Sequence, residues 1–397
     1  MSFEEERHFD SYLSFDTGCD DLDPSVLRAM SRPHYFPFDK EFVDYWAETE
    51  LLLRKLFGTK DNAVVPMIGP VRAGLDMAIR SLVEPGDKIL VPVNGWFGEL
   101  FIELVKECGG EPIVVEGRWG SAIDPAKVAQ ELDRHKGQIK AVTLTHVETA
   151  TGVINPAAEI GDIAKKRGLL FIMDCAHSIA SAEIKMDEWG ADICVGGSSK
   201  CMSASTGLAF VAVSKRAWKT MEQRKTPIAG WYSNLLWWKG SWIEKTRAGF
   251  SFPATLVFGV REVLDWIFEQ GLPQLYERYA VAGSAIREGL MAAGLKLVPD
   301  LSACANSVTV VFYPKGVKEK DFRELLYKRY HIGVSATYGP LAGKAFRTGP
   351  VGMVQLRPYN VMALVASVCA AMTELGADMH TKEAIEATAQ RLETGVS

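Results

Sequence analysis

Two residues of opposite charge each follow a short apolar run of the kind found in buried strands. Asp174 ends the run Leu-Leu-Phe-Ile-Met-Asp, and Lys200 follows Ile-Cys-Val-Gly-Gly-Ser-Ser, 26 positions further along (200 − 174). In an open α/β sheet, ligands bind beyond the carboxyl ends of the strands, where both side chains would lie. A strand-end aspartate can equally cap the next helix, and a lone lysine is more often a solvated surface residue.

Together, the two residues match the needs of one cofactor. Pyridoxal phosphate requires a lysine for a Schiff base and an acid that keeps its pyridinium nitrogen protonated. The glycines before Lys200 would let the backbone approach a ligand closely, and the serine hydroxyls could bind phosphate. Once a substrate amine displaces it, the lysine can move the α-proton as a general base. We therefore predict Lys200 and Asp174 as catalytic residues and pyridoxal 5'-phosphate as the cofactor.

The elements that would position these residues alternate between short apolar runs and amphipathic stretches. The runs are rich in Val, Ile and Leu and suit strands buried on both faces of a mainly parallel sheet. They cover residues 63–68, 88–93, 112–115, 141–146, 169–174, 192–195 and 208–213. The helical stretches between them cover residues 75–82, 98–108, 125–135 and 157–167. This alternation predicts a large α/β domain over residues 21–265, after an N-terminal arm of residues 1–20.

The remainder, residues 266–397, predicts a smaller C-terminal α+β domain. We expect one long helical stretch over 260–289, and then strands around a helix, followed by a final helix. The strands are expected at 295–298, 307–312 and 333–335, and the two helices at 320–329 and 361–375. The segment 231–242 carries five large aromatic residues, which favours a subunit interface or pocket wall and a local aromatic core about equally.

Composition excludes several classes of function. The net charge of −5 gives no electrostatic reason to expect nucleic acid or an anionic membrane as a partner. Seven cysteines without a C-x-x-C pair argue against a disulfide framework and against a structural zinc site. The acidic N-terminus and the absence of any apolar run of membrane-span length predict a cytoplasmic protein without a membrane anchor.

The segments Asp174-Cys-Ala-His-Ser and Gly-Ser-Ser-Lys200 resemble those of the class-V, fold-type-I aminotransferases that use pyridoxal phosphate. The resemblance is narrower to the alanine–glyoxylate, serine–pyruvate and pyridoxamine–pyruvate aminotransferases, and it covers nearly the whole chain. It implies a phosphate-binding turn at Gly69, Val71 and Arg72, where a helix begins. It further implies that Phe97, or alternatively Trp96, stacks on the pyridine ring.

The same resemblance assigns the other contacts. Thr149 corresponds to a residue that bonds the 3'-oxygen of the cofactor, and Ala176 to one that lies against the second face of the ring. Ser199 falls at a phosphate contact, and Ser251 could replace a threonine that a partner subunit contributes. Arg347 corresponds to the arginine that grips the substrate carboxylate, for which a bidentate guanidinium is suited.

The resemblance implies a homodimeric aminotransferase with shared active sites. It would move an amino group from a small amino acid or amine to a small 2-oxo acid such as pyruvate or glyoxylate. Alternatives are a pyridoxamine–pyruvate aminotransferase that uses free pyridoxal as a substrate, and a cysteine desulfurase or β-eliminating lyase on the same fold. The stretch 17–23 departs from the family's Gly-Pro pair, and Asp20 and Asp21 there would suit a cationic or amine-bearing substrate. The amino donor itself stays open.

Overall fold

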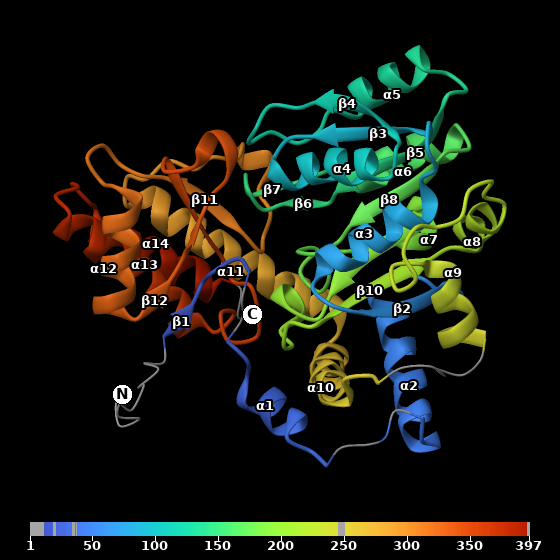
Figure 1. Ribbon diagram of the computed structural model, residues 1–397. Helices are drawn as coiled ribbons and strands as arrows, with labels where there is room; N and C mark the ends of the chain where they lie inside the picture. Colours follow the sequence, from blue (N-terminus) through green and yellow to red (C-terminus); the bar gives the residue numbers. More distant parts are fainter. Residues whose placement is uncertain (1–11, 19–20, 34–35, 37, 245–250, 395–397) are drawn as a thin grey trace, which may run out of the picture.

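The computed structural model describes residues 12–18, 21–33, 36, 38–244 and 251–394. Figure 1 shows a large lobe, built on a twisted sheet, beside a small lobe of helices and short strands. The sheet has seven strands in the order β2-β10-β9-β8-β5-β3-β4. Only β10 runs antiparallel to its neighbours, so the predicted mainly parallel, seven-stranded α/β sheet is confirmed. The strands are β2 (Ala63–Ile68), β10 (Leu208–Val213), β9 (Ile193–Gly197), β8 (Leu170–Asp174), β5 (Ile139–Thr145), β3 (Lys88–Val93) and β4 (Glu111–Glu116).

Burial explains the sequence of these strands. Every residue of β8, β9 and β10 is buried, as expected for strands covered on both faces, whereas the edge strand β4 is mostly accessible. The helix α3 packs on β9 and β10, α4 packs on β3, and α6 packs on β5 and β8. The helices of this lobe are α2 (Lys40–Leu56), α3 (Val71–Leu82), α4 (Trp96–Glu107), α5 (Pro125–Arg134), α6 (Ala157–Lys166), α7 (Met186–Trp189) and α8 (Lys215–Glu222).

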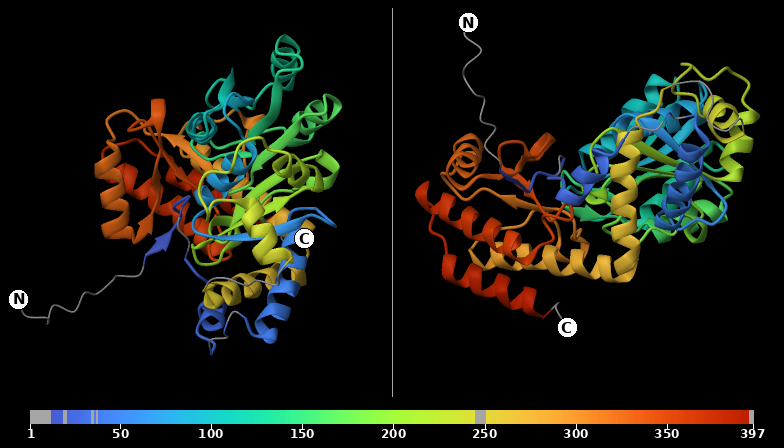
Figure 2. Two further views of the ribbon diagram at one scale, coloured as in Figure 1. Left: turned by 45° about the vertical axis from the view of Figure 1, so that its right-hand side comes forward. Right: turned by 90° about the horizontal axis from the view of Figure 1, so that it is seen from below.

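The small lobe contains a three-stranded antiparallel sheet in the order β11-β14-β13. Its strands are β11 (Thr309–Phe312), β14 (Ala345–Thr348) and β13 (Ser335–Ala336). Figure 2 shows the layer of long helices beneath it, in which α11 packs against α13 and α14. These helices are α11 (Leu272–Ala292), α12 (Glu319–Tyr330), α13 (Pro358–Glu374) and α14 (Thr381–Glu393).

Two expectations for this lobe need correction, and two of its elements were not predicted. The single helical stretch 260–289 is two helices, α10 (Ala254–Gln270) and α11, because Gly271 has a φ of 88° and Pro273 lies in the first turn of the second helix. The segment 295–298 contributes one isolated bridge, Leu297 to Val311, instead of a strand. The strand β14 and the helix α14 were not predicted. The expected domain boundary at residue 265 falls inside α10.

The described part of the N-terminal arm is bound to the small lobe. Strand β1 (Leu13–Ser14) pairs in parallel with β12 (Ile332–Gly333), and Phe15 is fully buried. A Cβ at Gly333 would lie 2.8 Å from Tyr12 Cε2 and 2.8 Å from Asp16 Oδ2, so a side chain at this position would displace both side chains of the arm. The helix α1 (Pro24–Met30) then packs on α10 and returns the chain to the large lobe.

The tryptophan-rich segment divides into a buried and an exposed part. It forms α9 (Leu235–Trp238) and a π-helical turn, Lys239–Glu244. Trp238 and Trp242 are buried, and the Trp242 ring lies 5.7 Å from that of Trp46 and 4.5 Å from that of Phe252. Trp231 is 62% exposed. Trp238 and Trp242 therefore belong to a local aromatic core, whereas Trp231 does not.

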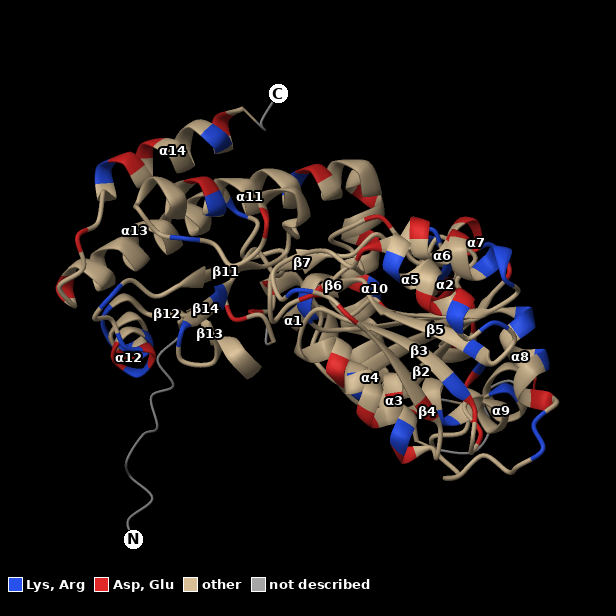
Figure 3. Cartoon of the chain, turned by 90° about the horizontal axis from the view of Figure 1, so that it is seen from above, with Lys and Arg blue, Asp and Glu red and all other residues tan. Residues whose placement is uncertain are grey.

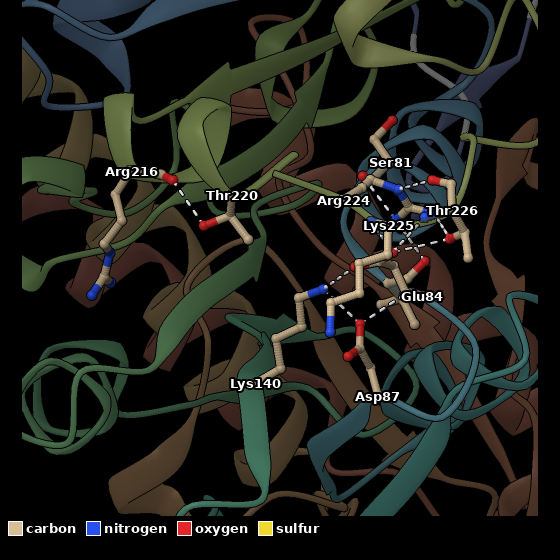
Figure 4. A network of polar contacts seen from close by, with 10 residues as sticks. Ser81, Glu84, Asp87, Lys140, Arg216, Thr220, Arg224, Lys225 and Thr226 are labelled. Atoms are coloured by element: carbon tan, nitrogen blue, oxygen red, sulfur yellow. Dashed lines mark hydrogen bonds and ion pairs between the residues drawn. The ribbon is translucent and has the colours of Figure 1, made fainter. Parts of the chain in front are cut away.

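A polar network holds the loop before this segment against the end of α3 (Figure 4). Glu84 accepts hydrogen bonds from the backbone N–H groups of Lys225 and Thr226, at 2.7 and 2.9 Å. Arg224 donates to the carbonyl oxygens of Ser81 and Val83. Elsewhere, acidic and basic residues are interspersed over the helices and loops of both lobes (Figure 3). Within the described ranges, no helix combines the length and the apolar character needed to cross a membrane.

Candidate active site

A cavity of about 500 Å³ lies where the parallel strands of the large sheet end, and residues of both lobes and of the arm line it. Its volume is within the roughly 300–1,000 Å³ that is usual for small-molecule sites. Eight of the residues singled out in the sequence line this cavity. They are Val71, Arg72, Phe97, Asp174, Ala176, Ser199, Lys200 and Arg347.

Asp174 ends β8 and is a buried carboxylate at the floor of the cavity, 4% exposed. Its Oδ1 accepts the N–H of Ala176 at 2.8 Å, and none of the described residues donates to its Oδ2. Burial raises the pKa of Asp174, while Lys200, the Ala176 N–H and Arg72 oppose that shift. The free oxygen is therefore able to accept a hydrogen bond from a ligand nitrogen.

Lys200 follows β9 in a strained backbone conformation. Its φ of 61° lies in the left-handed region, which is uncommon for residues other than glycine and often marks functional sites. Gly197, three residues earlier, lies so close to α3 that a Cβ would be 2.3 Å from Val71 Cγ2. This contact brings the lysine loop against the start of α3. Lys200 Nζ is 5.8 Å from the centre of the Phe97 ring.

The start of α3 can receive an anion. The helix begins after Pro70, and no side chain caps its first turn. Pro70, Val71 and Arg72 all line the cavity, so the unpaired N–H groups of that turn lie beside it. The Arg72 guanidinium lies over the rings of Trp96 and Phe97, 5.0 and 5.9 Å from their centres. Of these two aromatic residues, Phe97 lines the cavity and Trp96 does not.

Glu148 fixes the helix that carries Phe97. It is fully buried, and its Oε2 accepts the N–H groups of Phe97 and Gly98, both at 3.0 Å. Its Oε1 accepts the N–H of Ala150 at 3.0 Å. Burial raises the pKa of Glu148 to about 7, against the lowering effect of these N–H groups. Glu148 therefore joins the start of α4 to the loop that contains Thr149.

Arg347 lies on β14 and is 5% exposed. Its Nε donates to the carbonyl oxygen of Ala336 at 2.7 Å, and its Nη1 donates to Thr149 Oγ1 at 3.3 Å. The guanidinium lies 4.6 Å from the centre of the Tyr338 ring, which in turn stacks on Trp96 at 4.8 Å. Arg72 also lies over the Trp96 ring, so Arg347, Tyr338, Trp96 and Arg72 form a connected set of contacts, which we call the column of rings and arginines. Burial lowers the pKa of Arg347.

The N-terminal arm closes another side of the cavity with Asp16, Thr17 and Gly18. Ser335 Oγ donates to Asp16 Oδ1 at 2.8 Å and accepts the N–H of Thr17 at 3.0 Å. His177 Nε2 donates to the carbonyl oxygen of Thr17 at 2.7 Å. Burial lowers the pKa of His177 well below its usual value, so the imidazole is a neutral, buried group that anchors the arm.

Three of the predicted residues do not line the cavity. Gly69 precedes the lining residue Pro70 and donates its N–H to the carbonyl oxygen of Gly207. Thr149 is buried and contacts Arg347. Ser251 is exposed, and the resemblance assigns it to the site of a second subunit. Ala248, which stands near the position of a tyrosine in the family, lies outside the described residues.

The acidic residues expected at the substrate mouth also need correction. Asp20 lies outside the described residues, and Asp21 does not line the cavity. Asp21 Oδ2 instead accepts the N–H of Ser14 at 2.7 Å and that of Gln355 Nε2 at 3.3 Å. Besides Asp174, the acid that lines the cavity is Asp16, which the sequence analysis did not single out. The sequence analysis also missed Ser335 and Tyr338. In the sequence, Asp16 directly precedes the stretch 17–23, which departs from the family pattern, and Ser335 and Tyr338 lie shortly before Arg347. These positions were the only indication that the three residues belong to the site.

The described residues fit pyridoxal phosphate. The open oxygen of Asp174 suits a protonated ring nitrogen, and the uncapped start of α3 suits a phosphate. Phe97 and Ala176 both line the cavity. The flat ring of Phe97 and the small side chain of Ala176 leave room for an aromatic ring. Lys200 provides an amine at the same cavity.

Comparisons with known proteins agree with this geometry. The model of the family "Aminotransferase class-V" matches residues 29–374. The (S)-ureidoglycine–glyoxylate transaminase of Bacillus subtilis is 32% identical over 385 residues, which cover 92% of each chain. A crystal structure of ureidoglycine–glyoxylate aminotransferase from Bacillus subtilis has a TM-score of 0.90, covering 96% of this chain and 98% of that chain. The crystal structure of pyridoxamine–pyruvate aminotransferase from Mesorhizobium loti has a TM-score of 0.91 at 28% identity, covering 98% of both chains.

These neighbours define a fold-type-I aminotransferase. The chain belongs to the class-V aminotransferase family and is a transaminase.

Proposed function

We propose that this transaminase uses pyridoxal 5'-phosphate to move an amino group from a small amino acid or amine to a small 2-oxo acid, pyruvate or glyoxylate. The observation that carries the proposal is the convergence of Asp174, Lys200 and Arg347 on one cavity. The acceptor class is supported by relatives whose names specify glyoxylate or pyruvate.

The cofactor would supply an aldehyde for the amino group and a ring that accepts electrons from the substrate α-carbon. Asp174 Oδ2 would accept a hydrogen bond from the protonated ring nitrogen, and the N–H groups at the start of α3 would bind the phosphate together with Ser199 and Arg72. Gly69 would shape this turn, while Phe97 and Ala176 would lie against the ring. Thr149 Oγ1 accepts a hydrogen bond from Arg347, and the family resemblance would give it a contact with the 3'-oxygen of the ring.

Lys200 is the residue that moves the proton. Its Nζ accepts the proton from the α-carbon of the amino donor and later returns one to the 2-oxo acid carbon. Arg347 holds the substrate carboxylate through its guanidinium, which is already oriented by Ala336 and Tyr338. The buried setting excludes water, which strengthens this charge-assisted contact.

The cysteines favour transamination over cysteine desulfuration. A desulfurase needs a nucleophilic cysteine that reaches the cofactor. Cys369 is fully buried on α13, and Cys304 is half-buried with its thiol near the carbonyl oxygen of Asp300. Burial raises the pKa of both thiols. No described cysteine lines the cavity.

The test of the proposed function is spectroscopic. Purified protein is expected to be yellow, and borohydride should fix a pyridoxal compound on the peptide that contains Lys200. The Lys200→Ala variant should show no such adduct, whereas Lys296→Ala, a matched change outside the cavity, should retain it. A wild-type protein that takes up neither pyridoxal phosphate nor free pyridoxal would refute the proposal.

The same preparation distinguishes the pyridoxamine–pyruvate alternative. An enzyme that binds the phosphate at α3 should retain the visible absorbance after dialysis. Apoenzyme prepared from it should regain the absorbance only with pyridoxal phosphate. An enzyme that uses free pyridoxal as a substrate loses its absorbance on dialysis and converts pyridoxamine with pyruvate. The uncapped start of α3 and Arg72 support the first outcome.

The proposal includes a cytoplasmic homodimer in which each subunit contributes to the other's site. Ser251, exposed in one chain, would then contact the phosphate of the partner. Sedimentation should give twice the chain mass of 43.7 kDa, and Ser251→Ala should weaken phosphate retention. A monomeric, fully active enzyme would contradict this part.

A further inference from the structure

Five charged side chains line the cavity, and four of them have a part in the proposed function. Arg72 serves the phosphate, Asp174 the ring nitrogen, Lys200 the proton transfer and Arg347 the substrate carboxylate. Asp16 is the remaining charge. Within the described ranges no lysine, arginine or histidine lies within ion-pair distance of Asp16. Arg347 is close enough for the Asp16 charge to oppose the lowering of its pKa, and the Asp16 carboxylate lines the cavity beside it.

The position of Asp16 is fixed on the substrate side. Its Oδ1 accepts the hydroxyl of Ser335 at 2.8 Å, and Gly333 leaves room for its Oδ2. Ser335 is the direct register partner of Arg347 on the neighbouring strand. Directly opposed residues have Cβ atoms about 4.5–5.5 Å apart on one face of a sheet. The Asp16 carboxylate therefore lies one side chain away from the arginine proposed for the substrate carboxylate.

The short spacing between Asp16 and Arg347 would let the site discriminate between donors by the charge of their side chains. A donor whose carboxylate binds Arg347 brings its side chain within reach of a fixed negative charge. A second carboxylate on that side chain would be repelled, and a cation would form a charge-assisted hydrogen bond. The half-buried setting of Asp16 reduces the screening of both effects.

We propose that Asp16, oriented by Ser335, forms a distal subsite that binds a cationic ω-amino or guanidino group on the side chain of the amino donor. This inference rests on the proposed transaminase function and names its substrate class. The enzyme prefers a basic donor over a neutral one of the same length and rejects an acidic one.

The experiment measures kcat/KM of the holoenzyme for L-ornithine, L-norvaline and L-glutamate, with glyoxylate or pyruvate as acceptor and L-alanine and L-serine as further neutral donors. L-Norvaline has the carbon chain of L-ornithine without the terminal amine. Wild type should prefer L-ornithine over L-norvaline by about 10- to 100-fold, the range of a hydrogen bond to a charged group. Asp16→Asn should lower this ratio about 10-fold and raise the relative rate with L-glutamate.

Glu99→Gln is the matched control, because Glu99 is an exposed acid on α4 near Phe97 and does not line the cavity. It makes the same change in charge and should leave the ornithine-to-norvaline ratio as in wild type. Ser335→Ala removes the hydroxyl that orients Asp16 and should lower the ratio about threefold, a smaller effect than loss of the charge. It serves as the second variant if Asp16→Asn does not fold.

The outcomes separate this inference from the proposed function. If L-alanine, L-serine or L-norvaline reacts but L-ornithine is not preferred, the Asp16 subsite is refuted and the transaminase proposal stands. The same holds if the preference is present but neither Asp16→Asn nor Ser335→Ala reduces it. If no donor reacts and none changes the visible spectrum, the proposed function fails and the subsite fails with it.

Discussion

The two ends of the cavity are built in different ways. The end that is proposed to bind the cofactor, here called the cofactor end, lies at the carboxyl ends of parallel strands of one sheet, with Asp174 as the last residue of β8 and Lys200 after β9. The substrate end combines the N-terminal arm with the small sheet, where Thr17 bonds to Ser335, 318 positions away. The cofactor end depends on a rule of fold topology, whereas the substrate end depends on a pairing of distant segments. The chemistry and the specificity of the enzyme can therefore vary separately.

Of the substitutions that compare the two ends, Lys200→Ala at the cofactor end should have the largest effect on activity. Loss of the proton-moving amine should lower kcat by about 10⁴-fold. Single-turnover absorbance with an amino donor measures the effect, and added methylamine, a small replacement base, should restore part of the rate. Activity within tenfold of wild type would place the proton transfer on another residue.

At the substrate end, Arg347→Ala should lower kcat/KM roughly 10³-fold, since truncating a buried charged group that pairs with a ligand costs about 4 kcal/mol. The absorbance of the bound cofactor should remain, because Arg347 is proposed to bind the substrate. Steady-state kinetics beside a visible spectrum checks both points. Arg347→Lys should recover only part of the loss, as it cannot make the bidentate contact. Loss of cofactor together with activity would contradict the separation of the two ends.

Glu148 accepts hydrogen bonds from the start of α4 and from the loop that contains Thr149. Substituting Glu148 therefore tests whether the structures of the two ends of the cavity depend on each other. Its pKa is raised from 4.5 to about 7 in the folded protein. The folded state then binds more protons than the unfolded chain between these values, so the free energy of unfolding falls as pH rises from about 4.5 to 7. The fall is up to about 3 kcal/mol.

Chemical denaturation across this pH range, on wild type and Glu148→Gln, measures the slope. The variant should lose most of it, since glutamine does not titrate. A variant with the same slope as wild type would assign the pH dependence to other groups. Near-ultraviolet circular dichroism should also change in the variant, because the ring of Phe97 moves with α4.

The smallest expected effect concerns the column of rings and arginines. Tyr338→Ala should raise KM for the donor about tenfold, since it removes a cation–π contact to Arg347 worth roughly 1–2 kcal/mol. Tyr338→Phe keeps the ring and should change KM by less than about threefold. Equal effects of both variants would mean that the hydroxyl, and not the ring, orients Arg347.

The sequence analysis predicted the large sheet because its seven strands are local, continuous apolar runs, and six of them run in the same direction. It therefore placed Asp174 and Lys200 at one edge of the sheet without knowledge of long-range contacts, whereas Phe97 was placed by the family resemblance. It missed β14 because Ala345–Thr348 is a short strand that contains a charged residue. It missed Asp16 because the pairing of β1 with β12 involves two residues on each strand. Such short pairings leave no periodic pattern to read.

The parallel pairing of β1 with β12 also bears on the order in which the protein is made. The arm leaves the ribosome first, but its partner strand β12 (Ile332–Gly333) is made more than 300 residues later. The hydrogen bond between Thr17 and Ser335 likewise joins residues that are 318 positions apart. The strands and loops that carry Asp174 and Lys200 have emerged long before, and chains fold largely from the N-terminus during synthesis. A nascent chain can thus gain the cofactor end of its cavity while the wall that selects the substrate is still incomplete.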